Sequence, residues 1–382
     1  MWFLTDEHRM LQKSVRDFAL TTLAPQIDYL DEVEGFDRNY FKKMAELGLL
    51  GITAAEEWGG TAMGCVAATL AVEEIGAIDA STALSYLAHT ILTVNNIATN
   101  ASAEQKRRYL PRLISGEWVG GMGMTEPNAG SDALAMRTRA VRKGDKYILN
   151  GSKMFITNAV IGDVFYVYAR TGDGKKDIST FIVESNFPGF RMGKKLKKMG
   201  MRASPTGELI FENCEVPFEN LVGKEGDSVG HMLKNLDIER ITISGISLGL
   251  ARSSLEIATQ YAKERTQFGQ PIGQFQMIQA MLAEGWARAE AAAHYVYSTA
   301  QMWDLGKLDG SSSRVLSAKV KLVAAQTATQ IGLDAIQILG GYGYIKEFPV
   351  ERYMRDAKLM EIGAGTNEML RVIIARDLLG ET

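Results

Sequence analysis

Residues 239–265 read ERITISGISLGLARSSLEIATQYAKER and indicate how the C-terminal part of the chain is built. Apolar residues recur in this stretch with the period of a helix, and the run is far longer than the ~11–12 residues of an average globular helix. Two similar stretches follow at 275–306 and 313–339. Three long helices with apolar stripes predict a helical bundle, because each stripe has to be covered by a neighbour. We place this bundle in a C-terminal domain of residues 229–382.

Short alternating or β-branched runs precede the bundle and indicate strands. Asn150-Gly151 has the composition of a two-residue hairpin turn, and Lys143-Gly144-Asp145 predicts a second turn. We therefore expect a middle antiparallel β domain at residues 119–228. The runs that suggest its strands lie at 146–156, 163–170, 178–184 and 207–216.

The first part of the chain, residues 1–118, has the pattern of an α-helical domain. In 11–27 and 40–51 apolar residues recur every three or four positions, as on a helix with one buried face. Residues 69–100 are small and apolar nearly all round, which predicts a buried pair of helices. The fold class is therefore α+β and mainly α, with an N-terminal helical domain, an antiparallel β domain and a C-terminal helical bundle.

Composition is that of an ordinary globular protein, and we expect it in the cytoplasm. Of the 382 residues 46% are hydrophobic and 23% charged, and the net charge is −3. No apolar run approaches the ~20 residues of a membrane span, and the N-terminus lacks the pattern of a signal or transit segment. Because charges of both signs are mixed, a nucleic-acid partner is not expected. The one basic cluster consists of Lys194, Lys195, Lys197 and Lys198. It is expected on a solvated loop face, and a phosphate site is the less common alternative.

Metal chemistry is also not expected. The 2 cysteines stand alone and the 4 histidines show no spacing suited to metal ligands.

The segment Met122–Asp132, MGMTEPNAGSD, marks the passage from helices to sheet. Pro127 and Gly130 predict a tight turn whose backbone N–H groups lie beside the hydroxyls of Thr125 and Ser131. Such a group of donors suits a phosphate or the polar edge of a cofactor. An ordinary β-turn explains the same composition equally well.

The segment Lys153–Asn158, KMFITN, follows on a predicted strand. Alternation along a strand puts Phe155 and Thr157 on one face. An aromatic ring beside a hydroxyl can cover a flat cofactor and bond to its rim. Strand packing alone is the commoner reason for such a pair.

Two breaks between helices carry residues suited to a phosphate or a close backbone contact. Arg265 and Phe268 precede a Gly-Gln-Pro break, where an arginine can pair with a phosphate or lie in solvent. In residues 337–344, QILGGYGY, three glycines permit close approach of a ligand or another chain. This segment lacks the strand–turn–helix context of a Rossmann fingerprint, so nicotinamide binding is not supported.

Together, five segments resemble the acyl-CoA dehydrogenase family over essentially the whole chain. The resemblance implies an N-terminal helical domain, a middle β domain and a C-terminal four-helix bundle. It also implies bound FAD, an acyl-CoA substrate, a homotetramer built as a dimer of dimers, and electron transfer to electron-transfer flavoprotein. The segments are TEPNAGSD (125–132), KMFITN (153–158), ERTQFGQPIGQFQ (264–276), QILGGYGYIKEFPVERYMRDAK (337–358) and IGAGTNE (362–368).

The resemblance further assigns residues to cofactor and substrate. Along the flavin it implies Met122, Met124, Thr125, Gly130, Ser131, Phe155, Ile156 and Thr157. For the rest of the dinucleotide, held across a dimer interface, it implies Arg265, Phe268, Gln276, Gln337, Gly340 and Gly341, with Thr366 and Glu368 nearby. Acyl-CoA contacts are implied for Ser131, Asp237, Arg240, Gly363, Ala364 and Gly365.

Removal of two hydrogens from an acyl-CoA needs a carboxylate that takes the α-proton. Many members of the family place a Glu just before the Gly-Thr of the last segment, where this chain has Ala364. In the isovaleryl-CoA dehydrogenase branch the base instead precedes an Arg on the first bundle helix, a position that Glu239 matches. We therefore expect Glu239 to be the catalytic base, with a pKa raised toward neutrality by burial. Ala364 would keep only a backbone N–H role toward the thioester oxygen.

Gly363 stands where relatives often carry an aromatic residue, which leaves room for branching near the β-carbon. Isovaleryl-CoA is accordingly the leading substrate, followed by other short branched or cyclic acyl-CoAs. Other functions on the same fold are a flavin oxidase or desulfinase, a monooxygenase and a non-enzymatic scaffold. A base at Glu239 disfavours a desulfinase, the need for a separate reductant distinguishes a monooxygenase, and intact flavin segments disfavour a scaffold.

Overall fold

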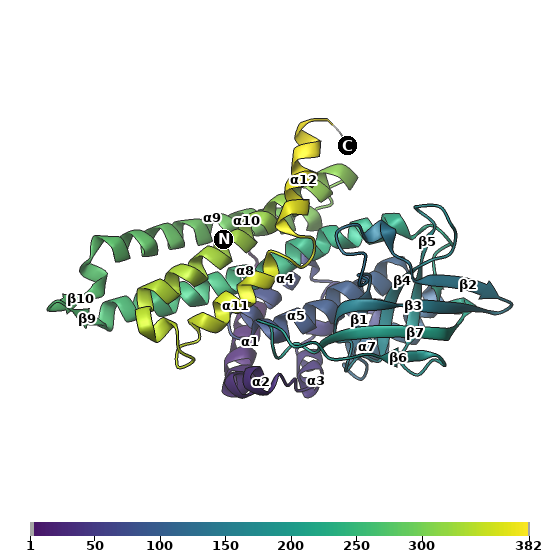
Figure 1. Cartoon of the computed structure of the whole chain (residues 1–382), viewed down its shortest axis with the longest axis horizontal. Helices are drawn as coiled ribbons and strands as arrows, with labels where there is room; N and C mark the ends of the chain where they lie inside the picture. Colours follow the sequence, from purple (N-terminus) through teal and green to yellow (C-terminus); the bar gives the residue numbers. More distant parts are fainter. Residues whose placement is uncertain (1–3, 381–382) are drawn as a thin grey trace.

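The computed structural model describes residues 4–380, which form three consecutive parts (Figure 1). Helices come first, a β-sheet follows, and long helices complete the chain. This is the order expected from the sequence, and the predicted fold class is confirmed.

The N-terminal part is helical and buries its two middle helices. α4 and α5 are buried along almost their whole lengths, which confirms the buried pair predicted from residues 69–100. α1 is amphipathic instead, with Val15 and Phe18 buried and Thr5 capping its first turn. The helices are α1 (Asp6–Phe18), α2 (Ile27–Val33), α3 (Asn39–Glu46), α4 (Gly64–Gly76), α5 (Ala80–His89), α6 (Asn96–Asn100) and α7 (Ala103–Ile114).

The long helix α8 (Ser228–Glu264) packs closely on α4, and two glycines make this possible. A Cβ atom added at Gly245 would lie 2.7 Å from the carbonyl oxygen of Thr69. One added at Gly249 would lie 2.5 Å from the carbonyl oxygen of Glu73. Any side chain at these positions would push the helices apart, so the sequence SGISLGLA brings α8 directly onto the N-terminal part.

The middle part is a single mixed sheet with strand order β6-β7-β3-β2-β4-β5-β8, and β1 beside β4. Most neighbours are antiparallel, as predicted, whereas β1 runs parallel to β4. β4 and β5 are buried almost throughout, because helices as well as strands cover them. The strands are β1 (Gly120–Gly123), β2 (Arg139–Lys143), β3 (Lys146–Thr157), β4 (Val164–Arg170), β5 (Ile178–Glu184), β6 (Phe190–Met192), β7 (Thr206–Pro217) and β8 (Leu221–Val222).

The hairpin turn predicted at Asn150-Gly151 is wrong, because β3 runs straight through it. The real turn is the second predicted one, where Gly144 has a φ of 64° and Lys143 pairs with Lys146. At Asn150 the pairing with β7 shifts register, and the backbone N–H of Asn213 donates to Asn150 Oδ1 over 2.8 Å. Pairing with a distant strand thus turned a favourable turn sequence into a β-bulge.

The C-terminal part consists of long antiparallel helices that extend away from the sheet (Figure 1). α8 and α9 are joined by a small hairpin of β9 and β10, at the end of the molecule opposite the sheet. The remaining elements are β9 (Thr266–Gln267), β10 (Gln270–Pro271), α9 (Gln276–Asp304), α10 (Gly310–Leu339), α11 (Val350–Met360) and α12 (Asn367–Leu378).

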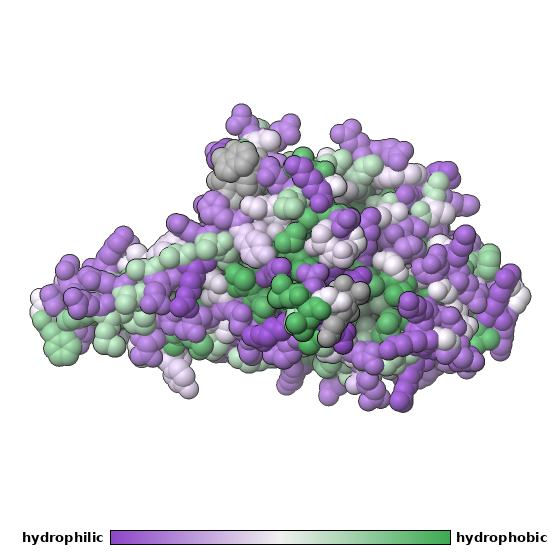
Figure 2. All heavy atoms as spheres, turned by 90° about the horizontal axis from the view of Figure 1, so that it is seen from above, coloured by the Kyte–Doolittle hydropathy of each residue, from purple (hydrophilic) through white to green (hydrophobic). Residues whose placement is uncertain are grey.

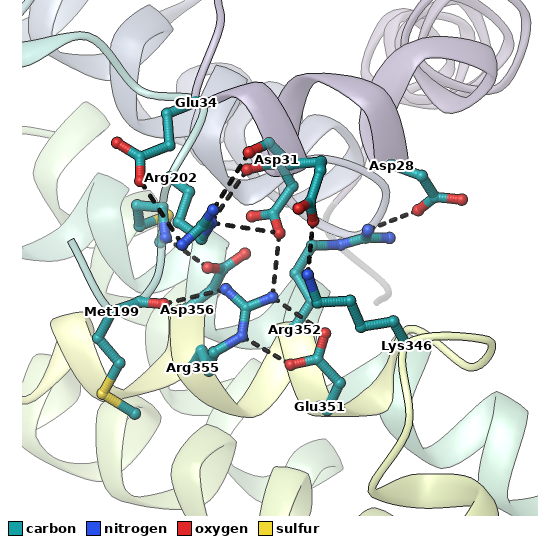
Figure 3. A network of polar contacts seen from close by, with 12 residues as sticks. Asp28, Asp31, Glu34, Met199, Arg202, Lys346, Glu351, Arg352, Arg355 and Asp356 are labelled. Atoms are coloured by element: carbon teal, nitrogen blue, oxygen red, sulfur yellow. Dashed lines mark hydrogen bonds and ion pairs between the residues drawn. The ribbon is translucent and has the colours of Figure 1, made fainter. Parts of the chain in front are cut away.

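An ion-pair network fastens α2 and the loop before β7 to α11 (Figure 3). Arg355 donates to Asp31 over 3.1 Å, and Arg202 lies 3.6 Å from the same carboxylate. The basic cluster belongs partly to this region, since Lys195 donates to the carbonyl of Glu34 and Lys198 to that of Ser204. The expectation of a wholly solvated lysine face is therefore wrong for these two, because Lys195 bonds to the residue after α2 and Lys198 bonds to a carbonyl of its own loop.

Among residues 4–380, no helix has a stretch long and apolar enough to cross a bilayer. Seen from above, hydrophilic residues cover most of the visible face, and apolar residues gather around its middle (Figure 2).

Candidate active site

Glu239 lies on α8, about three turns after the helix begins, where α8 passes between the sheet and the rest of the bundle. Only 6% of the residue is exposed, and its Oε2 atom has no hydrogen-bond partner among the described residues. Burial raises the pKa of Glu239 to about 7, against the charges of Arg240 and Lys321, which lower it. A buried, unpaired carboxyl group that titrates near neutrality can take up a proton.

The start of α8 rests on the strands that carry the first predicted flavin segment. Asn235 Nδ2 lies 3.5 Å from the sulfur of Met122, and Met232 packs in one apolar cluster with Met124. Burial and the neighbouring Tyr166 and Glu239 raise the pKa of Tyr168 on β4 well above its usual value. Glu239 is thus close to the inner strands of the sheet.

Asp237 and Arg240, the predicted substrate contacts on the same helix, are both buried. Arg240 Nη1 lies 3.3 Å from Asp237 Oδ1, while the hydroxyls of Ser313 and Ser317 on α10 donate to the two carboxylate oxygens over 3.1 and 3.3 Å. Burial raises the pKa of Asp237 and the charge of Arg240 opposes the rise. Since Asp237 precedes Glu239 by two residues, the two carboxylates face different sides of the helix.

The loop between α11 and α12 brings Gly363, Ala364 and Gly365 to the same region. Ala364 and Gly365 have φ values of 52° and 94°, so two successive residues adopt left-handed conformations. Arg240 Nε donates to the carbonyl of Ala364 over 3.2 Å, and Lys321 Nζ of α10 donates to that of Gly365 over 2.9 Å. The structure therefore brings this loop onto Arg240, the residue after Glu239, although more than 120 residues separate Arg240 and Ala364 in the sequence.

Sequence reasoning missed Lys321, which is 1% exposed. A signal for it existed, because Ala318, Lys321, Ala325 and Ala328 form one buried stripe of α10 at helical spacing. A lysine on such a stripe is seldom buried without a polar partner.

Lys153, a second residue that the sequence analysis did not single out, contacts the segment 122–131 from the interior of the sheet. Its fully buried ammonium group donates to the carbonyl of Met124 over 3.2 Å and to Glu126 Oε1 over 2.8 Å. Glu126 also accepts from the backbone N–H groups of Arg137 and Thr138 over 2.6 and 2.9 Å. The tight turn predicted here is present, closed by paired backbone hydrogen bonds between Glu126 and Ala129. Gly130 and Ser131 follow it and are exposed.

On β3, Phe155 lies at a second bulge and has a φ of 60°. Its ring is 65% exposed, whereas Ile156 beside it is buried in the sheet core. Thr157 is half-buried, and the backbone N–H of Met154 donates to the carbonyl of Thr125 over 2.8 Å. The two predicted flavin segments therefore touch each other.

The predicted residues for the far part of the dinucleotide do not join this group. They surround the opposite end of the long helices, and Arg265 is about 39 Å from Glu239 along α8. A cavity of about 500 Å³ opens there between Tyr261, Arg265 and the backbone of Gly340 and Gly341. Phe268 is 92% exposed at the tip of the β9–β10 hairpin, and Gln276 and Gln337 are exposed close by in the fold.

Thr366 and Glu368 do not lie at the end of the helices where Arg265 and Gly340 are found. Thr366 caps α12 and accepts from the backbone N–H of Met369 over 3.3 Å, so it continues the loop beside Glu239. Glu368 is exposed and lies 3.4 Å from Arg371.

Comparisons with known proteins agree on one family. Three family models match in order: the acyl-CoA dehydrogenase N-terminal domain at residues 5–117, the middle domain at 121–214 and the C-terminal domain at 229–379. A mitochondrial isovaleryl-CoA dehydrogenase from Oryza sativa is 45% identical over 380 residues, which cover 98% of this chain and 92% of the relative. An acyl-CoA dehydrogenase from Bacillus subtilis is 44% identical, over 99% and 100% of the two chains.

Solved structures give the same result. The butyryl-CoA dehydrogenase from Megasphaera elsdenii superposes with a TM-score of 0.95 at 38% identity, covering 98% of this chain and 99% of the other. A structure described as the FAD complex of PigA has a TM-score of 0.95 at 30% identity, over 99% of both chains. The chain belongs to the acyl-CoA dehydrogenase family and is an FAD-dependent oxidoreductase of acyl-CoA thioesters.

Proposed function

We propose that this chain dehydrogenates a short branched acyl-CoA, isovaleryl-CoA first among the candidates, with Glu239 as the base. The observation that carries this proposal is the environment of Glu239: a buried carboxyl group with an unpaired Oε2 and a pKa of about 7. Ala364 on the neighbouring loop offers no acid of its own. The carboxyl group needed by the reaction therefore comes from α8.

The surfaces predicted to hold FAD fit such a cofactor. Phe155 presents an exposed aromatic ring beside the hydroxyl-bearing Thr125 segment, which suits the cover of a flat ring system. A Cβ atom added at Gly340 or Gly341 would meet nothing within 4 Å, so backbone there is open to a ligand next to Arg265. Bound FAD supplies the hydride acceptor.

Within this proposal Glu239 takes the α-proton of the substrate onto its carboxylate. Because its pKa lies near neutrality, a good part of the enzyme holds the carboxylate form while the group remains a usable proton carrier. Backbone N–H groups of the Ala364–Gly365 segment would hold the thioester oxygen as negative charge develops on it. Arg240 serves by fixing this loop through the Ala364 carbonyl.

The branched substrate is supported by the space at Gly363 and by one relative. A Cβ atom added there would have only Leu359 within 4 Å, at 3.6 Å or more, so the position borders open room. The similar protein of Oryza sativa carries the name isovaleryl-CoA dehydrogenase. A wider pocket next to the reacting carbons favours a methyl branch.

The two distant groups of predicted FAD residues support an assembly of several copies. Residues about 39 Å apart on one helix cannot hold one compact cofactor, but each end can serve a cofactor shared with a second copy. We accordingly propose the homotetramer, a dimer of dimers, and electron-transfer flavoprotein as the electron acceptor. The cytoplasmic location and the roles of the individual site residues stay predictions.

Anaerobic titration of the yellow holoenzyme tests the proposed function. Isovaleryl-CoA, 2-methylbutyryl-CoA, butyryl-CoA and glutaryl-CoA are added in turn, and loss of the flavin absorbance is followed. We expect the fastest complete bleaching with isovaleryl-CoA and slow reoxidation by air. Faster bleaching by a straight-chain substrate would contradict the branched pocket, and oxygen uptake at the rate of turnover would indicate an oxidase.

A further inference from the structure

Lys321 is buried in α10 and forms no ion pair among residues 4–380. Its ammonium group donates instead to a backbone carbonyl, that of Gly365, over 2.9 Å. Burial, together with the charge of Arg240, lowers the pKa of Lys321 to about 8, while the charge of Glu239 raises it. A lysine placed in this way, on the loop that Arg240 also contacts, calls for a functional reason because burial of an ammonium group is costly.

Lys321 acts on the loop together with Arg240. The two cations hold two successive carbonyls, those of Ala364 and Gly365, from α8 and α10 respectively. In a planar trans peptide the C=O and the next N–H point in opposite directions. Fixing the Ala364 carbonyl therefore turns the N–H of Gly365 away from Arg240. Fixing the Gly365 carbonyl turns the N–H of Thr366 away from Lys321 and so holds Gly365 from its other end.

The backbone N–H groups of this segment, that of Thr366 included, have no protein acceptor among residues 4–380. Within the described part, the N–H groups of Ala364 and Gly365 donate to no protein acceptor, although those of Ile362 and Gly363 both donate to the Leu359 carbonyl. Successive backbone N–H groups in a turn of this kind form a concave site for negative charge. The loop thus offers backbone donors to a ligand close to Arg240 and Lys321.

We propose that Lys321 is a positioning residue for the dehydrogenation: with Arg240 it holds the 364–365 segment so that its free N–H groups bind the thioester oxygen. The proposal rests on the proposed function of Glu239. Lys321 also contributes a positive charge near the base and so stabilises the carboxylate before the proton arrives. Arg240 cannot hold the segment by itself, because among the described residues only Lys321 donates to the Gly365 carbonyl.

The test uses Lys321→Met, which removes the donor, Lys321→Gln, which keeps a donor without charge, and Lys321→Arg. Lys319→Met on the same helix is the matched control, because Lys319 makes no side-chain hydrogen bond or ion pair in the part of the chain described. Each holoenzyme is examined for FAD content, thermal unfolding and anaerobic flavin reduction as a function of pH. Calorimetry then compares the affinity for a 3-ketoacyl-CoA, whose enolate carries charge on the thioester oxygen, with that for the saturated acyl-CoA.

For Lys321→Met we expect full FAD content and a flavin reduction rate lowered about 10- to 100-fold, somewhat less than direct loss of an oxyanion donor. Affinity for the 3-ketoacyl-CoA should fall about tenfold while that for the saturated thioester changes little. The kinetic pKa of Glu239 should rise, because Arg240 on α8 is then the one remaining cation facing it, with Tyr168 on the β4 side. Lys321→Arg should restore most of the rate, and Lys321→Gln should restore the enolate affinity more than the kinetic pKa.

Unchanged reduction rate, enolate affinity and kinetic pKa in Lys321→Met would overturn the proposal. If that variant fails to fold, Lys321→Gln decides by the same three measurements. Glu239→Gln is run alongside: retained reduction there would remove the base assignment itself. If Glu239→Gln loses flavin reduction while Lys321→Met behaves as the wild type, the role of Lys321 is refuted and that of Glu239 is kept.

Discussion

Replacement of Glu239 by Gln tests both the chemistry and the electrostatics of the site. The change removes the ionisable group and nearly keeps its shape. A rise of the pKa from 4.5 to about 7 means that the folded protein holds the carboxylate less favourably than the unfolded chain. Since each tenfold change in an acid constant is worth about 1.4 kcal/mol, ionised Glu239 destabilises the fold by about 3 kcal/mol.

The sign of this effect sets its pH window. Well below pH 4.5 the group is protonated in both the folded and the unfolded state and does not affect the stability. As pH rises from 4.5 through about 7, the unfolded chain releases the proton first, and the wild type loses stability that Glu239→Gln does not lose. The variant should therefore gain about 3 kcal/mol over the wild type between pH 4.5 and pH 8, whatever constant offset the amide group introduces.

Two assays check the prediction on the FAD-loaded protein. Thermal unfolding of both proteins from pH 4.5 to pH 8 should show the difference in Tm growing by several degrees with pH. Anaerobic flavin reduction by isovaleryl-CoA should fall by about 10²–10⁴-fold in the variant, the usual worth of a general base. A Tm difference that stays constant with pH, or near-normal flavin reduction, would refute the reasoning.

Three further predictions concern the same framework. The value of kcat/KM for acyl-CoA, which reports on the free enzyme, should rise with pH and level off above about 7, because Glu239 loses its proton in this range. If a plot of kcat/KM against pH shows no rise near neutrality, Glu239 is not the base. Lys153→Met leaves Glu126 buried without its ion-pair partner, so it should lower the free energy of unfolding, measured with denaturant, by about 3 kcal/mol and weaken FAD retention. A variant with the stability and the flavin content of the wild type would contradict this role of Lys153. Gly249→Ala places a Cβ atom 2.5 Å from the Glu73 carbonyl oxygen and should lower Tm by an amount equivalent to about 1–3 kcal/mol of stability. The control Gly310→Ala, where an added Cβ atom meets nothing within 4 Å, should leave Tm nearly unchanged. Equal effects of the two substitutions would contradict the close packing of α8 on α4.

Local patterns in the sequence are sufficient for the elements and their order. The long apolar stripes of 239–265, 275–306 and 313–339 became α8, α9 and α10, because helical periodicity is set by neighbours three and four residues away. The same holds for the buried pair α4 and α5 and for strands β3, β4, β5 and β7, half of the strands of the sheet. Glu239 was predicted as the base from the exchange of residues at positions 239 and 364, which rests on the resemblance to the acyl-CoA dehydrogenase family.

Tertiary structure alone decided features that depend on partners distant along the chain. Asn150-Gly151 has a good turn sequence, yet pairing with β7 over many residues outweighs the local preference and leaves a bulge. The carbonyls that Lys321 and Lys153 hold, those of Gly365 and Met124, belong to loops that meet α10 and β3 only in the folded chain. The elevated pKa of Glu239 likewise arises from burial among helices and sheet that meet only in the folded chain.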